Sequence, residues 1–199
     1  MNAAAPLVRQ LALGPMDNFT YLIADPTGGD AAVVDPGWDV AAILSAAAEA
    51  GCRIEKILLT HAHGDHAQEA PQLARRTGAA IHLHEKERSL LPPDLPLVAT
   101  AEGSTIALGS LAIRCLHTPG HTPGSQCFLL GEHLFTGDTL FVDDCGRVDL
   151  PGSSPAQMVA SLHRLAELPP QTIVWPGHDY GPTPSSTIGR QRVTNPEMR

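Results

Sequence analysis

The feature that most constrains this chain is a dense run of polar side chains directly after an apolar segment. Residues 54–60 read as a buried strand, and the next six residues hold three imidazoles, His61, His63 and His66, and the carboxylate of Asp65. Alternate residues of an extended chain project to one side, so His61 and His63 are expected to face together. Asp65 and His66 would then come off a turn for which Gly64 supplies backbone freedom. Neutral imidazoles and carboxylates are ligands that zinc, iron and manganese accept, so the segment predicts a metal site.

Three later motifs decide between one metal and two. Residues 118–125 place His121 in a Pro/Gly-rich loop between predicted strands, residues 135–139 place Asp138 at a strand end, and residues 176–179 do the same for His178. A single ion needs only three or four protein ligands. Seven candidate ligands therefore favour two ions.

The remaining pattern predicts a layered fold. Apolar runs bounded by Gly and Pro predict strands at 7–13, 18–24, 31–34, 54–60, 80–83, 105–108, 111–117, 126–130, 133–136 and 172–175. Helical composition and capping residues predict helices at 39–50, 67–77 and 154–168, with a short one from about residue 185. The first three strands read as an antiparallel meander. This order fits an α/β (α+β) fold of two packed sheets with helices outside, in one domain over residues 1–199.

Composition excludes several classes of protein. The chain is 43% hydrophobic and 17% charged, which is typical of a globular protein, and its formal charge of -8 argues against nucleic acid as a partner. No apolar run approaches the ~20 residues that span a bilayer, and the N-terminus lacks a secretory signal, so no membrane association is expected. The four cysteines form no C-x-x-C pair, which indicates free thiols and a cytoplasmic location.

The motifs together resemble the metallo-β-lactamase superfamily. Its signature T-H-x-H-x-D-H, a P-G-H loop, a G-D turn and a last G-H occur in this order from Thr60 to His178. The resemblance implies a four-layer αββα sandwich with two mixed β-sheets, and a hydrolase that uses a metal-bridging hydroxide. It also implies the ligand sets: His61, His63 and His121 for the first metal, Asp65, His66 and His178 for the second, and Asp138 between them, with Asp65 also orienting the nucleophile. Zinc is the expected metal, and iron or manganese would be accepted by the same ligands.

Residues 135–142 and the following C-G-R are similar to the hydroxyacylglutathione hydrolase (glyoxalase II) group. That resemblance implies that Arg147 and Tyr180 contact a glutathione thioester, a small-molecule substrate. An arginine fork suits the carboxylates of glutathione. Ordinary glyoxalase II has an additional C-terminal helical region, whereas this chain ends about 20 residues after His178 and looks more like the short bacterial relatives.

Other activities stay open at this point. The P-G-H-T-P-G, C-G-R-x-D and H-D-Y motifs also resemble persulfide dioxygenases, in which His61, His121 and Asp138 would hold one iron. A β-lactamase is disfavoured because no export signal is visible. A nuclease is disfavoured because the chain is too short and too acidic for a nucleic-acid-binding domain. A non-catalytic metal sensor is disfavoured because seven ligands around two ions leave open positions for water and substrate. Cys145 is expected to be a packing residue. Five histidines outside the motifs are expected to have ordinary core or surface roles: His82, His84, His117, His133 and His163.

Overall fold

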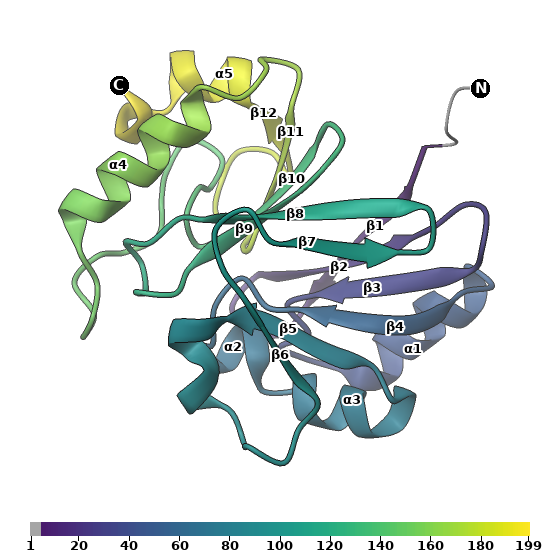
Figure 1. Cartoon of the computed structure of the whole chain (residues 1–199). Helices are drawn as coiled ribbons and strands as arrows, with labels where there is room; N and C mark the ends of the chain where they lie inside the picture. The colour runs from purple at the N-terminus through teal and green to yellow at the C-terminus, as the bar shows by residue number, and fades with distance from the viewer. Residues whose placement is uncertain (1–4) are drawn as a thin grey trace.

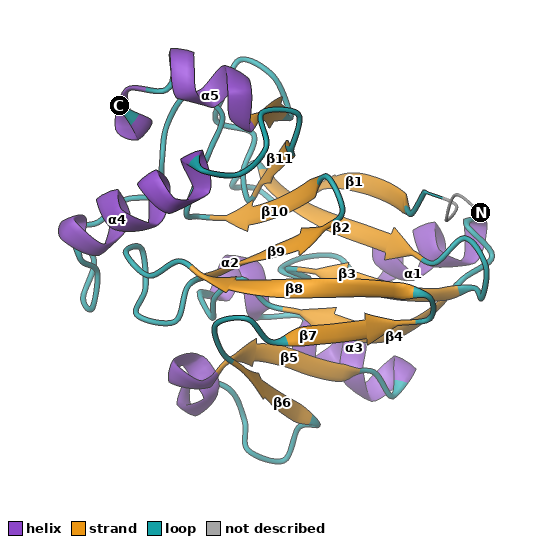
Figure 2. Ribbon diagram, turned by 45° about the horizontal axis from the view of Figure 1, so that its top comes forward, coloured by secondary structure: helices purple, strands orange, loops and turns teal. Residues whose placement is uncertain are grey.

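The protein, described over residues 5–199 by a computed structural model, consists of two six-stranded sheets packed face to face (Figure 1). The strand order is β1-β2-β3-β4-β5-β6 in the first sheet and β12-β11-β10-β9-β8-β7 in the second. Helices lie on the outer side of each sheet (Figure 2). The predicted αββα sandwich is confirmed.

The first sheet is mixed. Its strands are β1 (Leu7–Leu13), β2 (Asn18–Ala24), β3 (Asp30–Val34), β4 (Arg53–Leu58), β5 (Ala80–His84) and β6 (Leu97–Thr100). The first three strands form the predicted antiparallel meander, and β3 to β6 run parallel. The accompanying helices are α1 (Val40–Glu49), α2 (Gly64–Ala67), α3 (Ala70–Thr77) and the short 3-10 helix η1 (Glu85–Leu90).

The second sheet is also mixed, because β10 and β11 are parallel while its other neighbours are antiparallel. Its strands are β7 (Thr105–Leu108), β8 (Leu111–His117), β9 (Gln126–Leu130), β10 (His133–Gly137), β11 (Ile173–Pro176) and β12 (Ser186–Thr187). Helices α4 (Pro155–Ala166), α5 (Ile188–Thr194) and η2 (Pro196–Met198) cover its outer face.

Successive side chains of β2 alternate between the two apolar layers that lie on either side of the first sheet. Leu22 and Ala24 pack against α1 on one face, while Tyr21 and Ile23 pack against the second sheet on the other. A third apolar layer lies between the second sheet and α4, where Met158 and Leu162 are buried. Side chains two residues apart on a strand share a face, so one strand serves two cores.

The structure differs from the predicted order of elements at three places. The helix expected at 67–77 is divided into α2 and α3, because the ring of Pro71 cannot follow the carbonyl of Ala67 in a continuous helix. Strand β6 was not predicted, because the prolines of residues 92–96 mask the short apolar run that follows them. The last helix begins at Ile188 rather than near residue 185, because Ser186 and Thr187 pair with β11 first.

The four cysteines are all unpaired, as the sequence predicts. Within residues 5–199, no helix is both long enough and apolar enough to cross a membrane.

Candidate metal centre

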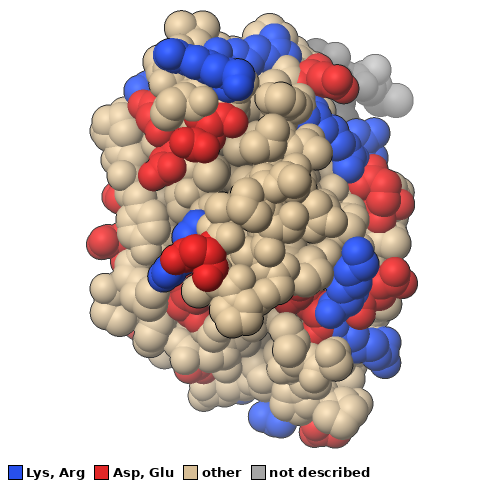
Figure 3. Space-filling view, turned by 90° about the vertical axis from the view of Figure 1, so that its left-hand side faces the viewer, with Lys and Arg blue, Asp and Glu red and all other residues tan. Residues whose placement is uncertain are grey.

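The loops that follow strands β4, β8, β10 and β11 meet at one end of the sandwich. The β4 loop and α2 carry residues 61–66, the β8–β9 loop carries His121, and the chain after β10 and β11 carries Asp138 and His178. The β8–β9 loop lies at the left-hand side of Figure 1, the face shown in Figure 3. Most of the middle of that face is uncharged in Figure 3, apart from one cluster of basic and acidic side chains left of the centre.

All seven side chains predicted as metal ligands lie together there. Their potential ligand atoms form three groups, each with its atoms within 4.8 Å of one another. The groups are His61, His63 and His121; Asp65, His66 and His178; and His61, His66 and Asp138. The third group joins the other two into one cluster.

Asp138 lies between the two outer groups. Its Oδ1 is 3.2 Å from Nε2 of His66 and 3.5 Å from Nε2 of His178, and its Oδ2 is 3.5 Å from Nε2 of His121. One carboxylate therefore directs an oxygen toward each group.

Outer hydrogen bonds orient the imidazoles. Nδ1 of His178 is 2.8 Å from the carbonyl oxygen of Met16, and Nδ1 of His66 is 3.0 Å from Oδ2 of Asp35. Each Nδ1 donates to that oxygen, which leaves an unprotonated Nε2 in the neutral ring. The two Nε2 atoms are only 3.1 Å apart, so their lone pairs face each other unless a cation lies near both.

His61 gives the clearest test of whether these residues fit a metal. Its Nδ1 is 3.1 Å from Oγ1 of Thr60, which in turn donates to Asp35 at 2.6 Å. Its Nε2 is buried and finds no hydrogen-bond partner among residues 5–199. Buried polar atoms rarely lack a partner. A lone pair aimed into a cluster of imidazoles and carboxylates fits a divalent ion.

The electrostatics also favour cations. Burial lowers the pKa of His61, and the neighbouring charge of His66 lowers it further, so its ring stays neutral. Burial raises the pKa of Asp138, but positive charge on His66 and the contact with His178 outweigh burial and hold it well below its usual value. Burial lowers the pKa of His178, but Asp138 and Asp65 outweigh burial and raise it to about 9. Ionised carboxylates here attract a positive charge, whether a proton or a metal.

The sequence interpretation missed two supporting residues. Asp35, at the end of β3, accepts hydrogen bonds from the backbone N–H of Thr60 at 2.8 Å, from the Thr60 hydroxyl and from His66. Asn18 donates to Oδ2 of Asp65 at 3.0 Å and itself accepts from Nε1 of Trp38. Asp35 had a usable signal, because an aspartate directly after an apolar strand repeats the position of Asp138. Asn18 had none, because it lies far from Asp65 in the chain.

Two glycines behave differently from each other. Gly64 begins α2, and a Cβ there would contact nothing within 4 Å, so the expectation that its backbone freedom makes the turn was wrong. The turn is the helix α2 itself. At Gly177, by contrast, a Cβ would lie 2.7 Å from Oδ1 of Asp138 and 2.9 Å from Cε1 of His66. Glycine is needed there for close approach.

A cavity of about 390 Å³ opens beside the cluster, and both predicted substrate-binding residues lie in its wall. The side chain of Arg147 is 64% exposed, and its guanidinium forms two hydrogen bonds with Asp149, at 2.7 and 2.8 Å. Tyr180 stacks on His178 with ring centroids 4.5 Å apart. Cys145 also lines this cavity, and burial raises the pKa of its thiol to about 11, so it is a weak nucleophile.

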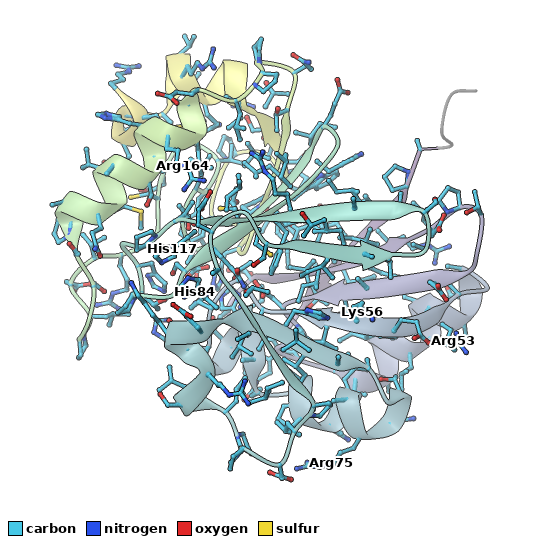
Figure 4. The ribbon with its side chains drawn as sticks, in the orientation of Figure 1. Arg53, Lys56, Arg75, His84, His117 and Arg164 are labelled. Carbon is cyan, nitrogen blue, oxygen red and sulfur yellow. The ribbon has the colours of Figure 1, made fainter. Side chains whose placement is uncertain are left out.

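The other histidines lie outside the cluster. In the part of the chain that the structure describes, none of the five belongs to a group able to hold a metal. His84 and His117 stack on each other with ring centroids 4.1 Å apart and are labelled in Figure 4.

Comparisons with known proteins agree with this geometry. The sequence profile of the metallo-beta-lactamase superfamily matches residues 13–178. The probable polyketide biosynthesis zinc-dependent hydrolase PksB of Bacillus subtilis (strain 168) is 35% identical over 173 residues, covering 86% of this chain and 77% of PksB. A hydroxyacylglutathione hydrolase of Anaeromyxobacter dehalogenans (strain 2CP-C) is 45% identical over 82% of this chain, which spans 62% of that relative's length.

Solved structures show the same fold. ETHE1 from Myxococcus xanthus superposes with a TM-score of 0.88 at 33% identity, covering 96% of this chain and 83% of that one. TTHA1623, solved in a di-iron-bound form, gives a TM-score of 0.83 at 35% identity, covering 95% of this chain and 99% of that one. Fold, residue cluster and sequence profile agree, and the chain belongs to the metallo-beta-lactamase superfamily.

Proposed function

We propose that this protein is a metal-dependent hydrolase that cleaves thioesters of the glutathione type at a two-metal centre. The observation that carries the proposal is the position of Asp138, whose two oxygens face two separate groups of candidate ligands. The hydroxyacylglutathione hydrolase that is 45% identical to the chain supports the substrate class. The four unpaired cysteines fit a reducing compartment such as the cytoplasm.

In this proposal, His61, His63 and His121 would hold the first ion, Asp65, His66 and His178 would hold the second, and Asp138 would be shared by both. Zinc is the metal in the name of PksB, and iron occupies TTHA1623, so both are candidates. Two bound divalent ions would supply Lewis acidity, which activates water and polarises a carbonyl.

Asp65 is the proposed catalytic carboxylate. Burial raises its pKa, but its hydrogen bond with His178 and the charge of His66 outweigh burial, so the carboxylate is ionised at neutral pH. Asn18 holds Oδ2 from one side at 3.0 Å. A carboxylate fixed in this way accepts a hydrogen bond from the attacking water and sets its direction.

Arg147 and Tyr180 are the proposed contacts to the thiol portion of the substrate. Both line the cavity, and Arg147 already binds one carboxylate, that of Asp149, with paired hydrogen bonds. A glutathione carboxylate would replace Asp149 on the same fork, since the pair is exposed and such surface pairs contribute little free energy.

A second candidate is the mononuclear iron persulfide dioxygenase that the C-G-R-x-D and H-D-Y motifs resemble. The rings of His61 and His121 lie with centroids 4.9 Å apart, and Nε2 of His121 is 3.5 Å from Asp138. These three residues are able to form a two-histidine, one-carboxylate face for iron.

One preparation of metal-loaded protein tests both candidates. Hydrolysis of S-lactoylglutathione without oxygen uptake on glutathione persulfide is the expected result. Oxygen uptake on the persulfide without thioester hydrolysis would overturn the proposal in favour of the dioxygenase.

A further inference from the structure

A second groove opens on the metal centre. It has a volume of about 260 Å³ and shares His63 with the larger cavity. The segment 150–152 separates the two spaces, because Leu150 lines the larger cavity while Pro151 and Gly152 line the groove. A substrate that reacts at the metal centre therefore has two separate spaces for its two portions.

A buried carboxylate holds the wall of this groove in place. Glu87, on η1, is 2% exposed, and its Oε1 accepts hydrogen bonds from Oγ1 of Thr122 at 2.8 Å and from the backbone N–H of Gly124 at 2.9 Å. Its Oε2 accepts from the backbone N–H of Ala62 at 3.1 Å. Helix η1 is thus tied to both loops that carry the His61, His63 and His121 group, and the groove is preformed.

The wall of the groove is mainly apolar and carries one positively charged side chain. Leu90, Pro123 and Pro151 supply the apolar surface, and Lys86 supplies the ammonium group. The Glu87 carboxylate is already used by three donors. All ion pairs between a carboxylate and a lysine or arginine within residues 5–199 are made by arginines, so Lys86 forms no ion pair with a carboxylate in that range.

A thioester has an acyl portion and a thiol portion, on opposite sides of the reacting carbonyl carbon. The proposed function places the thiol portion beside Arg147 and Tyr180 in the larger cavity. We propose that the groove binds the acyl portion and that Lys86 pairs with a carboxylate at its far end. Thioesters of short dicarboxylic acids are then preferred substrates. This inference rests on the proposed thioester hydrolysis.

Four thioesters separate the roles of the two spaces: glutaryl and pentanoyl groups, each carried by glutathione and by the neutral thiol N-acetylcysteamine. Replacing Lys86 by Met (Lys86→Met) should lower kcat/KM for both glutaryl thioesters roughly fivefold and leave both pentanoyl thioesters unchanged, as for a solvent-exposed ion pair. Arg88→Met is the matched control, because Arg88 is a cation on the same short helix that does not line this groove. It should leave all four values unchanged.

Equal effects of Lys86→Met on glutaryl and pentanoyl thioesters would overturn the inference, and so would an effect that follows the thiol rather than the acyl group. If the metal-loaded wild type hydrolyses none of the four, the proposed function fails instead. The proposed role of the groove is then tested by direct binding of glutarate. A Kd roughly fivefold higher for Lys86→Met than for the wild type supports the role of Lys86, and equal Kd values overturn it.

Discussion

At the scale of single residues, the candidate metal centre depends on which atom of each imidazole is already engaged. Nδ1 of His61, His66, His121 and His178 each has an oxygen partner outside the cluster, at 2.8 to 3.1 Å. When these rings are neutral, as in a metal site, Nε2 of each therefore faces the cluster with a lone pair. Outer partners of this kind fix ring orientation and tautomer in metal sites.

The first residue-scale prediction concerns Asp138. Asp138→Ala removes the carboxylate shared by both groups, so we expect the metal content to fall from two ions per chain to at most one, with a loss of thioester hydrolysis of at least roughly a hundredfold. Elemental analysis and S-lactoylglutathione turnover measure the two effects. The exposed Asp94→Asn is the control and should change neither. An Asp138→Ala variant with two metals and full activity would sink the bridging role.

The second residue-scale prediction concerns His82, a buried ring on β5 whose two nitrogens have no hydrogen-bond partner in residues 5–199. Burial, with a smaller effect of Lys56 (Figure 4), lowers its pKa from 6.5 to about 4. Replacing His82 by Leu should therefore raise the free energy of unfolding at pH 7 by ~1 kcal/mol or more, because an unsatisfied polar group is removed.

The same replacement should change the pH dependence of stability. As pH falls below 6.5 the unfolded chain takes up a proton at His82, whereas the folded protein does so only near pH 4. The wild type should then lose about 1 kcal/mol per pH unit relative to His82→Leu across this window, and no more below it. Urea unfolding at pH 7, 6 and 5 measures the difference, with His163→Gln as an exposed control. Parallel curves for the wild type and His82→Leu would contradict the prediction.

The sequence predicted the candidate ligands better than it predicted the residues that hydrogen-bond to them or to their loops. The seven ligand candidates were found because several lie close together in the chain or in short Pro/Gly motifs, which leave a local pattern. Glu87 was not found, because it accepts hydrogen bonds from residues 25 or more positions away, and such bonds leave no local pattern. Asp35 was missed although its position directly after an apolar strand was a usable signal.

At the scale of elements, the site exists because strands of both sheets end at the same edge. Phe19 N–H donates to the carbonyl of Gly177 at 2.8 Å, and Asn18 pairs with His178, so β2 of the first sheet contacts the chain after β11 of the second. Most strands were predicted within two residues because their apolar runs are bounded by turn residues. Strand β6 was not predicted, because the prolines before it obscured its short apolar run. The break between α2 and α3 was not predicted, because the composition of the whole segment is helical.

The element-scale prediction uses two glycines. Gly177→Ala would force a methyl group to 2.7 Å from Asp138, so the loop after β11 must shift and carry His178 away from the second group. We expect metal content to fall by about one ion per chain while the circular dichroism spectrum is retained. Gly64→Ala is the matched control, because its methyl group meets open space. Full metal content in Gly177→Ala would show that the close approach is not required.

At the scale of the whole molecule, the candidate ligands join the two halves of the sandwich. His61, His63, Asp65 and His66 follow a strand of the first sheet, and His121, Asp138 and His178 follow strands of the second. Ions bound by these residues would link the two sheets beyond the apolar contacts between them. That residues 1–199 form one domain stays a prediction from length.

Metal removal tests this link. Ligands that bind only the folded state stabilise it by mass action, so dialysis against a chelator should lower Tm by several degrees, and zinc should restore it. Calorimetry before and after chelation measures the shift. An unchanged Tm in protein shown to have lost its metal would mean that the ions do not hold the sheets together.

Asp138 and the six other candidate ligands are proposed to form a two-metal centre. Elemental analysis of the purified protein tests it most directly. We expect close to two divalent ions per chain, with zinc as the leading candidate. About one iron per chain, with the second group empty, would contradict it and favour the dioxygenase instead.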